Sequence, residues 1–325
     1  MLFRSIYQAL AQTTSEFPTA AAMGTPLLVF GIAVVLAQKL MLGNQARFVT
    51  HGGRAFRTAG RPSLLAAAGI FIFFVVTTVL PLISLGILAL SPFWSPRIRL
   101  ATLTLDNFRQ VFAESAIVDA ILTSLLVSLA SVAICLVIGF AVASILVRGR
   151  QNPLLKGLLD IVVSLPLGVP AVIFGAGFLL AYTRPPLILY GTPWVLVVVY
   201  VTLMLPFATR MQLAAMLQLG SAYVEAARVA GAGPLRAALT VTLPLMRQSL
   251  AGAAALMFVL LTHEFTASVL VRSPGNQVMG TVLFEYWTNG SYPLVAAIAL
   301  IMTAVTAFGV LAATILGGGD TLNRL

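Results

Sequence analysis

The chain contains 325 residues, of which 60% are hydrophobic and 9% are charged, and its mean hydropathy is +1.03. A soluble domain carries about 25% charged residues, so this chain cannot cover itself with a surface that water tolerates. Its formal net charge of +10 does not indicate a nucleic-acid partner, because the basic residues lie between apolar runs rather than on one soluble face. The composition predicts an integral membrane protein embedded in the lipid bilayer.

Seven apolar runs follow one another along the chain, and they predict an all-α polytopic bundle of about seven transmembrane spans. Each run is long enough to cross a hydrocarbon core about 30 Å thick at about 1.5 Å per residue. The runs do not alternate apolar and polar residues, which favours helices over a barrel. They cover residues 24–43, 64–90, 120–147, 155–182, 187–209, 248–270 and 293–317.

Loops rich in arginine and lysine alternate with loops that are poor in them, which predicts the orientation. If loop 44–63 faces the cytoplasm, loops 148–156 and 210–247 and the C-terminal tail face it too, and the N-terminus lies outside. We therefore expect an outside N-terminal segment, a first span and a basic cytoplasmic loop in 1–63, followed by a transmembrane domain in 64–325. The cytoplasmic side then collects Arg47, Arg54, Arg57, Arg61, Arg148, Arg150, Lys156, Arg210, Arg228, Arg236, Arg247 and Arg324, and the other side has Arg4, Arg97, Arg99, Arg109, Arg184 and Arg272.

Between the fifth and sixth runs, "EAARVAGAGPLRAALTVTLP" predicts a helix–turn–helix elbow. Ser221 is the expected N-cap of its first helix, and Glu225 falls early in that helix, where a carboxylate suits the positive end of the dipole. Gly231 accepts the left-handed conformation of a helix C-cap. Pro234 suits the first position of a second helix, which we expect to end at Pro244.

The alanine face of this elbow, which includes Ala226, Ala227 and Ala230, would let another backbone approach closely. Such a surface suits docking into a groove on a partner protein, and an ordinary interhelical loop is the alternative that composition leaves open. The spacing favours docking: Glu-Ala-Ala, three residues, Gly, nine residues, an aliphatic residue, any residue and Leu-Pro. This pattern resembles the cytoplasmic signature of type I ABC importer permeases.

In that family the elbow enters a cleft on a separate ATP-hydrolysing subunit. The resemblance therefore implies that the loop couples closure of the ATPase to alternating access in the spans. The residues that it assigns to coupling are Glu225, Ala226, Ala227, Arg228, Gly231, Gly233, Pro234, Leu243 and Pro244. A P-loop needs Gly-Lys-Ser/Thr, and neither Lys39 in "AQKLM" nor Lys156 in "LLKGL" fits, so we expect ATP hydrolysis on another polypeptide.

Three further segments are similar to the iron(III)-type branch of these permeases: "TLTLDNFRQVF", "SLPLGVPAVIFGAGFLL" and "HEFTASVLVRSPGNQVMGTVLFEYW". The likeness covers residues 100–317. The opening "LFRSIYQAL" is similar to a junction inside fused, double-length members, which implies either a split half-permease or the second half of a longer protein. Ferric iron is the substrate that the resemblance favours, and related branches carry polyamines, thiamine, sulfate or aminoethylphosphonate.

The resemblance also implies the location and the partners. We expect the chain in the bacterial cytoplasmic (inner) membrane, with the C-terminus in the cytoplasm. Its partners would be two ABC ATPase subunits, a second permease subunit or half, and an extracytoplasmic substrate-binding protein.

The fourth run is interrupted by Pro166, Gly168 and Pro170, and further along by Gly175 and Gly177. Prolines free backbone carbonyls, and such breaks are tolerated in a span only where protein or a water-filled cavity covers them. We therefore predict that this run lines the translocation path. A kinked packing helix is the alternative.

His263 and Glu264 lie in the sixth run, and an ionisable residue inside a membrane marks a pathway or a pair. We assign both to the predicted path. A structural hydrogen bond to a neighbouring helix is the alternative for Glu264, and for His263 the alternative is to snorkel or to pair with neighbours of Glu264. Asp160 is expected to form an i,i+4 ion pair with Lys156 near the membrane surface. The outer loop after the sixth run either meets a substrate-binding protein or is solvated, and its polar residues include Arg272, Asn276 and Gln277.

Two other classes of function remain open. A secondary transporter needs intramembrane acids as a coupling site and often a repeated half, for which Glu264 is the main support. A membrane-embedded enzyme needs a convergent set of acids, bases or metal ligands. The single cysteine, Cys135, and the two histidines form no such pattern, so we predict no catalytic residues, no cofactor and no metal site.

Overall fold

A computed structural model describes residues 63–95, 100–149 and 152–317 and parts of a short helical stretch at 25–26, 28–34 and 37. Every regular element in these ranges is helical, which confirms the predicted all-α class. Half of the predicted first span, the basic loop up to residue 62 and the tail from residue 318 lie outside the described residues.

Four continuous helical segments are long and apolar enough to cross a membrane. They are Leu64–Leu90, Ser115–Arg148 (α6), Pro193–Leu219 (α9) and Tyr292–Leu316 (α16). The first consists of α3 (Leu64–Phe74), a π-helical turn (Val75–Val79) and α4 (Leu80–Leu90).

Two bent pairs supply up to two more spans, so the described residues contain four to six. In the first pair, α7 (Pro153–Ser164) and a 3-10 turn (Leu165–Gly168) meet α8 (Ala171–Tyr182) at 106°. In the second, Pro234–Leu245 meets α13 (Arg247–Thr262) at 72°. The predicted fourth run is therefore a broken helix. The predicted sixth run, 248–270, starts after the 72° bend and is broken further along, between Thr262, where α13 ends, and Ser268, where the next helix begins.

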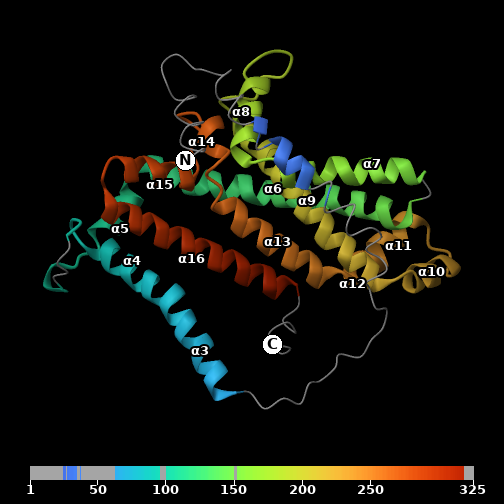
Figure 1. Ribbon diagram of the computed structural model, residues 1–325, viewed down its shortest axis with the longest axis horizontal. Coiled ribbons are helices and arrows are strands. Elements are labelled where there is room, and N and C mark those ends of the chain that lie inside the picture. Colours follow the sequence, from blue (N-terminus) through green and yellow to red (C-terminus); the bar gives the residue numbers. More distant parts are fainter. Residues whose placement is uncertain are drawn as a thin grey trace.

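Short helices connect these segments. They are α5 (Asp106–Ala113), α10 (Ala222–Val229), α11 (Pro234–Ala237), α12 (Leu243–Leu245), α14 (Ser268–Val271) and α15 (Met279–Thr288). In Figure 1, α5 and α15 lie at one end of the bundle, and α10 and α11 lie at the other.

The centre of the bundle is the contact between α6 and α9. Small residues of α6 recur at helical spacing and are buried, among them Ser124, Ser128, Ser131, Cys135 and Gly139. They let the two backbones approach so closely that a Cβ placed on Gly139 would lie 3.0 Å from the Cβ of Ala208. Small residues are the usual means by which membrane helices reach such close packing.

Hydrogen bonds cross the same contact. The Ser131 hydroxyl donates to the Val197 carbonyl at 3.5 Å, and the Gln212 amide donates to the Leu136 carbonyl at 3.1 Å. The Cys135 thiol lies 3.6 Å from the Val201 carbonyl, so this buried cysteine makes a weak polar contact as well as packing between the helices. These bonds fix the rotation of α6 relative to α9, since apolar packing alone has little directionality.

Each end of the bundle has its own apolar cluster. One cluster joins α4, α5, α6, α15 and α16 through residues that include Val111, Ile117 and Met279. The other joins α6 and α9 to the elbow through Ala143, Met216 and Met246. The two clusters thus hold α5 and α15 at one end of the bundle and the elbow at the other.

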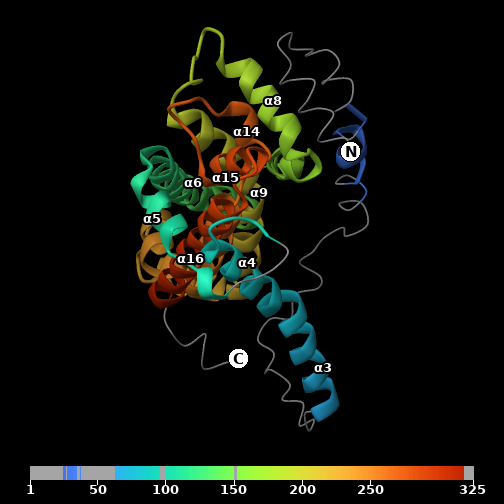
Figure 2. The ribbon, with the colours of Figure 1, turned by 90° about the vertical axis from the view of Figure 1, so that its left-hand side faces the viewer.

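The segment α3–α4 stands apart from this packing. No residue of α3 is buried, and Figure 2 shows α3 leaving the bundle. Only Ala89, near the end of α4, is buried against the rest of the protein. Most of this span therefore presents apolar side chains outward, as a lipid-facing or subunit-facing helix does.

Two glycines of α8 provide a matched test of the packing between the broken helices. A Cβ on Gly175 would lie 2.9 Å from the Ala267 carbonyl oxygen, whereas a Cβ on Gly177 would meet nothing within 4 Å. We predict that Gly175→Ala lowers stability by about 1–3 kcal/mol through overpacking, and that Gly177→Ala is neutral or stabilising. Thermal unfolding in detergent measures both, and equal effects of the two variants would contradict this packing.

Candidate functional site

The first part of the candidate site is the elbow formed by α10 and α11. Ser221 occupies the predicted N-cap position of α10, but its side chain makes no capping hydrogen bond. Glu225 lies in the first turn and is exposed, and Arg228 lies in the last turn. Both charges suit the helix dipole.

The turn of the elbow depends on Gly231. Its φ is +87°, in the left-handed region that favours glycine. The Gly231 amide donates to the Arg228 carbonyl at 3.0 Å and the Ala232 amide donates to the Ala227 carbonyl at 2.9 Å, which is the Schellman pattern of a helix C-terminus. Gly233 then caps α11, and Pro234 is its first residue. The predicted turn is confirmed.

The predicted helix end at Pro244 is wrong. The chain continues through a π-helical turn (Ala238–Thr242) and ends this helix at Leu245, and the 72° bend falls at Met246. In the π turn the Leu243 amide donates to the Ala238 carbonyl, five residues back. Pro244 therefore lies at the start of a new helical register, where its missing N–H costs little.

Most of the predicted coupling residues are accessible. Ala227 and Leu243 are half-buried, and the exposed ones are Glu225, Ala226, Arg228, Gly231, Gly233, Pro234 and Pro244. Large apolar side chains at other positions of the elbow are also exposed. The exposed fractions are 56% for Tyr223, 90% for Val229, 72% for Leu235, 54% for Leu239 and 50% for Leu245. We call these five residues the elbow surface. The signature spacing does not reveal them, although apolar residues in a polar loop are a usable signal.

The second part of the candidate site is the region where the two broken helices meet. Pro166 and Gly168 lie in the 3-10 turn between α7 and α8, and Pro170 precedes α8. Through the close approach of Gly175 to Ala267, α8 packs on the break between α13 and α14. The structure thus places α8, which follows Pro166, Gly168 and Pro170, against the segment between α13 and α14, which contains His263 and Glu264.

The first break is also approached by the described part of the N-terminal helical stretch. A Cβ built on Gly31 would overlap the carbonyl oxygen of Gly168, at 1.4 Å. Position 31 therefore admits only glycine at this separation of the two backbones. A segment far from Gly168 in sequence covers the break on this side.

Glu264 stabilises the second break. Its carboxylate accepts hydrogen bonds from the Ala267 amide at 2.7 Å, from the Ser268 amide at 3.0 Å and from the Ser268 hydroxyl. The Ser268 hydroxyl lies 2.9 Å from the hydroxyl of Tyr200, a buried residue of α9. His263 is exposed, and its Nδ1 lies 2.9 Å from the Val259 carbonyl. These contacts match the structural alternative for Glu264.

Lys156 was the expected partner of Asp160, but the structure shows an ion pair with a residue on another helix. Asp160 forms an ion pair with Arg210 of α9 at 2.9 Å, and the same guanidinium nitrogen donates to the Ser164 hydroxyl at 2.6 Å. Lys156 donates to the Leu146 carbonyl at 3.3 Å. Arg210 thus ties α7 to α9 next to the first break. Sequence spacing could not indicate this pair, because its members lie on different helices.

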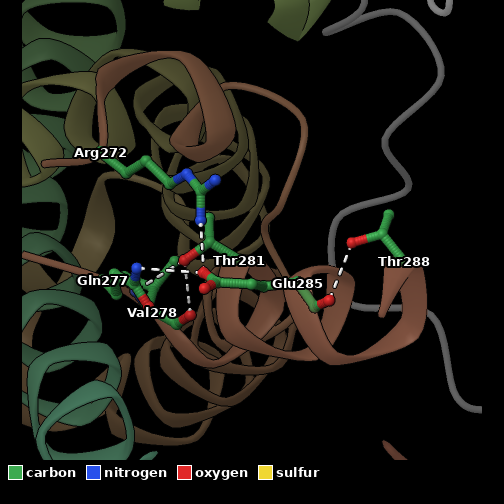
Figure 3. Close-up of polar contacts among 6 residues, drawn as sticks. All are labelled: Arg272, Gln277, Val278, Thr281, Glu285 and Thr288. Atoms are coloured by element: carbon green, nitrogen blue, oxygen red, sulfur yellow. Dashed lines mark hydrogen bonds and ion pairs between the residues drawn. The ribbon is translucent and has the colours of Figure 1, made fainter. Parts of the chain in front are cut away.

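The loop after α14 makes polar contacts with the helix that follows it (Figure 3). Arg272 pairs with Glu285 at 3.2 Å, and the Gln277 amide donates to the same carboxylate at 3.3 Å. The Val278 amide donates to the Thr281 hydroxyl at 3.0 Å at the start of α15. Two of the three polar residues expected in this loop therefore meet one carboxylate.

The third polar residue of the loop, Asn276, is buried and donates to the Gly191 carbonyl, before α9. In the same end of the bundle, burial raises the pKa of the Tyr286 hydroxyl, and a hydrogen bond to Glu114 acts in the same direction. Among the residues that the structure describes, no group of three His, Cys, Asp or Glu side chains could hold a metal ion.

The long apolar helices, the broken helices and the exposed elbow between two spans define a polytopic membrane transport subunit. Residues 136–318 match the family described as binding-protein-dependent transport system inner membrane component, and the chain belongs to that family. It is a multi-pass inner-membrane permease of the ABC importer class.

Curated relatives carry related descriptions. An ABC transporter permease protein of Streptomyces antibioticus is 36% identical over 56% of this chain and 79% of its own length. The 2-aminoethylphosphonate transport system permease protein PhnV of Salmonella typhimurium is 27% identical over 75% of this chain and 92% of its own length. The ferric transport system permease protein FbpB of Actinobacillus pleuropneumoniae is 23% identical over 92% of this chain but only 44% of its own length.

Two solved structures share the fold. A bacterial ABC transporter involved in the import of alginate matches with a TM-score of 0.64 and 18% identity, over 78% of this chain and 94% of that chain. The MetNI methionine ABC transporter matches with a TM-score of 0.52 and 20% identity, over 62% and 94%. These likenesses confirm the type I ABC permease architecture.

The Asp160–Arg210 pair generates a prediction for stability. Arg210→Met should lower the free energy of unfolding by about 1–3 kcal/mol, because it leaves a partly buried carboxylate without this guanidinium. Asp160→Asn/Arg210→Met should recover part of that loss, since the carboxylate charge that Arg210 faced is gone as well. Thermal unfolding in detergent measures both, with Arg184→Met in the exposed α8–α9 loop as the control. A single variant as stable as the control would contradict a structural role for the pair.

Proposed function

We propose that the chain imports its substrate by alternating access and that the elbow couples this movement to ATP hydrolysis on a partner subunit. The observation that carries the proposal is the elbow surface: Tyr223, Val229 and Leu235 are each more than half exposed at a turn fixed by Gly231. Apolar side chains gathered at one end of a membrane protein, between two spans, suit a protein partner. The Glu225-Ala226-Ala227 signature lies on the same elbow.

The proposed assembly contains two ATPase subunits, one for each permease subunit or half, and an extracytoplasmic binding protein. FbpB supports a second permease half, because the alignment that covers 92% of this chain covers 44% of that protein. One solved alginate transporter is described as a complex with an alginate-bound periplasmic protein. By analogy, the end of the bundle that carries α5 and α15 would receive the binding protein.

Ferric iron is the substrate that we propose first, and 2-aminoethylphosphonate is the second candidate. FbpB, named for ferric transport, aligns with nearly the whole chain, and PhnV, named for 2-aminoethylphosphonate, aligns with 75% of it. Uptake of radioactive ferric iron and of labelled 2-aminoethylphosphonate by cells that produce the complete transporter distinguishes them. The translocation path would run past the breaks at 166–170 and 263–264, along the packing of Gly175 against Ala267.

The proposed orientation places the elbow and the C-terminus in the cytoplasm. Cys135 is buried, so a cysteine introduced at an exposed position can be labelled selectively. We predict that a membrane-impermeant maleimide labels Leu187→Cys in intact cells and Tyr223→Cys only in inverted vesicles. Wild-type protein is the control for labelling of Cys135, and the reverse pattern would show that the orientation is inverted.

Binding of an ATPase subunit tests the proposed function directly. The experiment captures detergent-solubilised permease with candidate ATPase subunits and compares wild type with Gly231→Val. A Cβ at Gly231 meets nothing within 4 Å, but its φ of +87° is strained for valine. We expect binding to fall by about tenfold or more, because a left-handed residue other than glycine costs roughly 1–2 kcal/mol and β-branching adds to this.

Gly252→Val is the matched control, because a Cβ there also meets nothing within 4 Å and no left-handed φ is involved. It should bind the ATPase subunit like wild type. If wild-type permease binds no ATPase subunit and an ion gradient alone drives uptake, the proposed function fails. If a well-inserted Gly231→Val variant binds the ATPase subunit as tightly as wild type does, the conformation of the turn is not needed for docking.

A further inference from the structure

The base of the elbow is attached to the bundle at two places. The Arg148 Nη1, at the last residue of α6, donates to the Thr242 hydroxyl in the π-helical turn at 3.1 Å. Met246, which follows α12, packs in the cluster with Ala143 of α6 and Met216 of α9. The first attachment is polar and directional, and the second is apolar.

Burial changes sharply between the tip and the base of the elbow. Val229 and Leu235 at the tip are 90% and 72% exposed, whereas Thr242 and Met246 at the base are 0% and 2% exposed. The π-helical turn also packs against α10. A force applied to the tip therefore reaches the bundle through the base, where Thr242 and Met246 are in contact with the spans.

The hydrogen bond of Arg148, a half-buried residue, is unusual for an arginine whose guanidinium is partly enclosed. Its acceptor is a neutral hydroxyl, and the other terminal nitrogen, Nη2, is buried without a hydrogen-bond partner in the described part of the chain. A buried donor without a partner costs free energy. Stabilisation of the fold alone therefore does not account for this arrangement, since a fully hydrogen-bonded ion pair would stabilise it more. An arginine in this state can exchange acceptors when the elbow moves.

The Arg148–Thr242 hydrogen bond constrains the orientation of the elbow relative to α6, whereas the apolar packing of Met246 does not. A hydrogen bond weakens steeply when its angle changes, whereas apolar packing is non-directional and can slide. Arg148 belongs to α6, which packs closely on α9, and Arg210 of α9 holds Asp160 beside the first break. A continuous set of contacts thus runs from the elbow to the broken helix.

We propose that the Arg148–Thr242 hydrogen bond transmits displacement of the elbow to α6 and α9, so that Arg148 and Thr242 are positioning residues for transport. The inference rests on the proposed function, since it assumes that an ATPase subunit moves the elbow. It deepens that function by separating docking, which the elbow surface performs, from transmission, which this contact performs.

Thr242→Val tests the proposal, because valine keeps the shape of threonine and removes the hydroxyl. The experiment uses the full-length permease assembled with its ATPase subunits, with ATP as the ligand, and needs no knowledge of the substrate. Two quantities are measured: the affinity for the ATPase subunit, and the stimulation of ATP hydrolysis in the complex relative to free ATPase subunits. We expect unchanged affinity and a roughly tenfold loss of stimulation, in line with loss of a hydrogen bond to a charged group.

The controls separate this link from general damage. Thr303→Val removes a hydroxyl that donates to the Ala299 carbonyl on an exposed face of α16 and should behave like wild type. Thr242→Ser keeps the hydroxyl and should retain stimulation, whereas Arg148→Met should reproduce the loss seen in Thr242→Val. Rescue by serine is an outcome that a purely steric role of Thr242 would not produce.

Each outcome bears on the proposal in a defined way. Normal stimulation in Thr242→Val, or an equal loss in Thr303→Val, would overturn it while the proposed function stands. Loss of ATPase binding or of membrane insertion in Thr242→Val and Arg148→Met would show that the contact serves docking or folding, and would also overturn it. Failure of wild-type permease to bind an ATPase subunit would instead refute the proposed function itself.

Discussion

The close packing of α6 on α9 is the constraint on which the rest of the structure depends. Membrane helices gain no hydrophobic driving force by leaving lipid, so they associate through close contact and hydrogen bonds. The buried small residues of α6, from Ser124 to Gly139, allow the close contact, and Ser131 and Gln212 make the hydrogen bonds. A bulky residue at Gly139 would separate the two helices, because its Cβ already meets Ala208 at 3.0 Å.

Both parts of the candidate site are built on the ends and flanks of this helix pair. The elbow rests on Arg148 of α6 and Met216 of α9, and the first break is held to α9 by Arg210. Tyr200 of α9 reaches the second break through Ser268. A movement that changes the angle between α6 and α9 would therefore act on the elbow and on both breaks together, and this geometry is compatible with alternating access.

Much of the architecture follows from sequence alone, because in lipid a long apolar run has few options other than a helix. The turn at Gly231 and Pro234 was predictable for a similar reason, since each residue permits few backbone conformations. The continuation past Pro244 was not, because a π turn shifts the hydrogen-bond register and removes the usual penalty of proline. The Asp160–Arg210 pair was also hidden, since residues fifty positions apart meet only after α7 folds back on α9. Glu264 was located by its charge, but its bonds to the α14 amides depend on where α13 breaks.

The exposure of the elbow surface has a consequence for the cell as well as for the transporter. In the proposed orientation, apolar side chains such as Val229 and Leu235, which are exposed in the subunit, would contact water until another protein covers them. Binding of that protein stabilises the folded subunit by mass action, so a permease produced in excess of its partner would be the less stable and more aggregation-prone fraction. The supply of one subunit would thereby set the lifetime of the other, and balanced production would be favoured by the same five side chains that form the proposed docking surface.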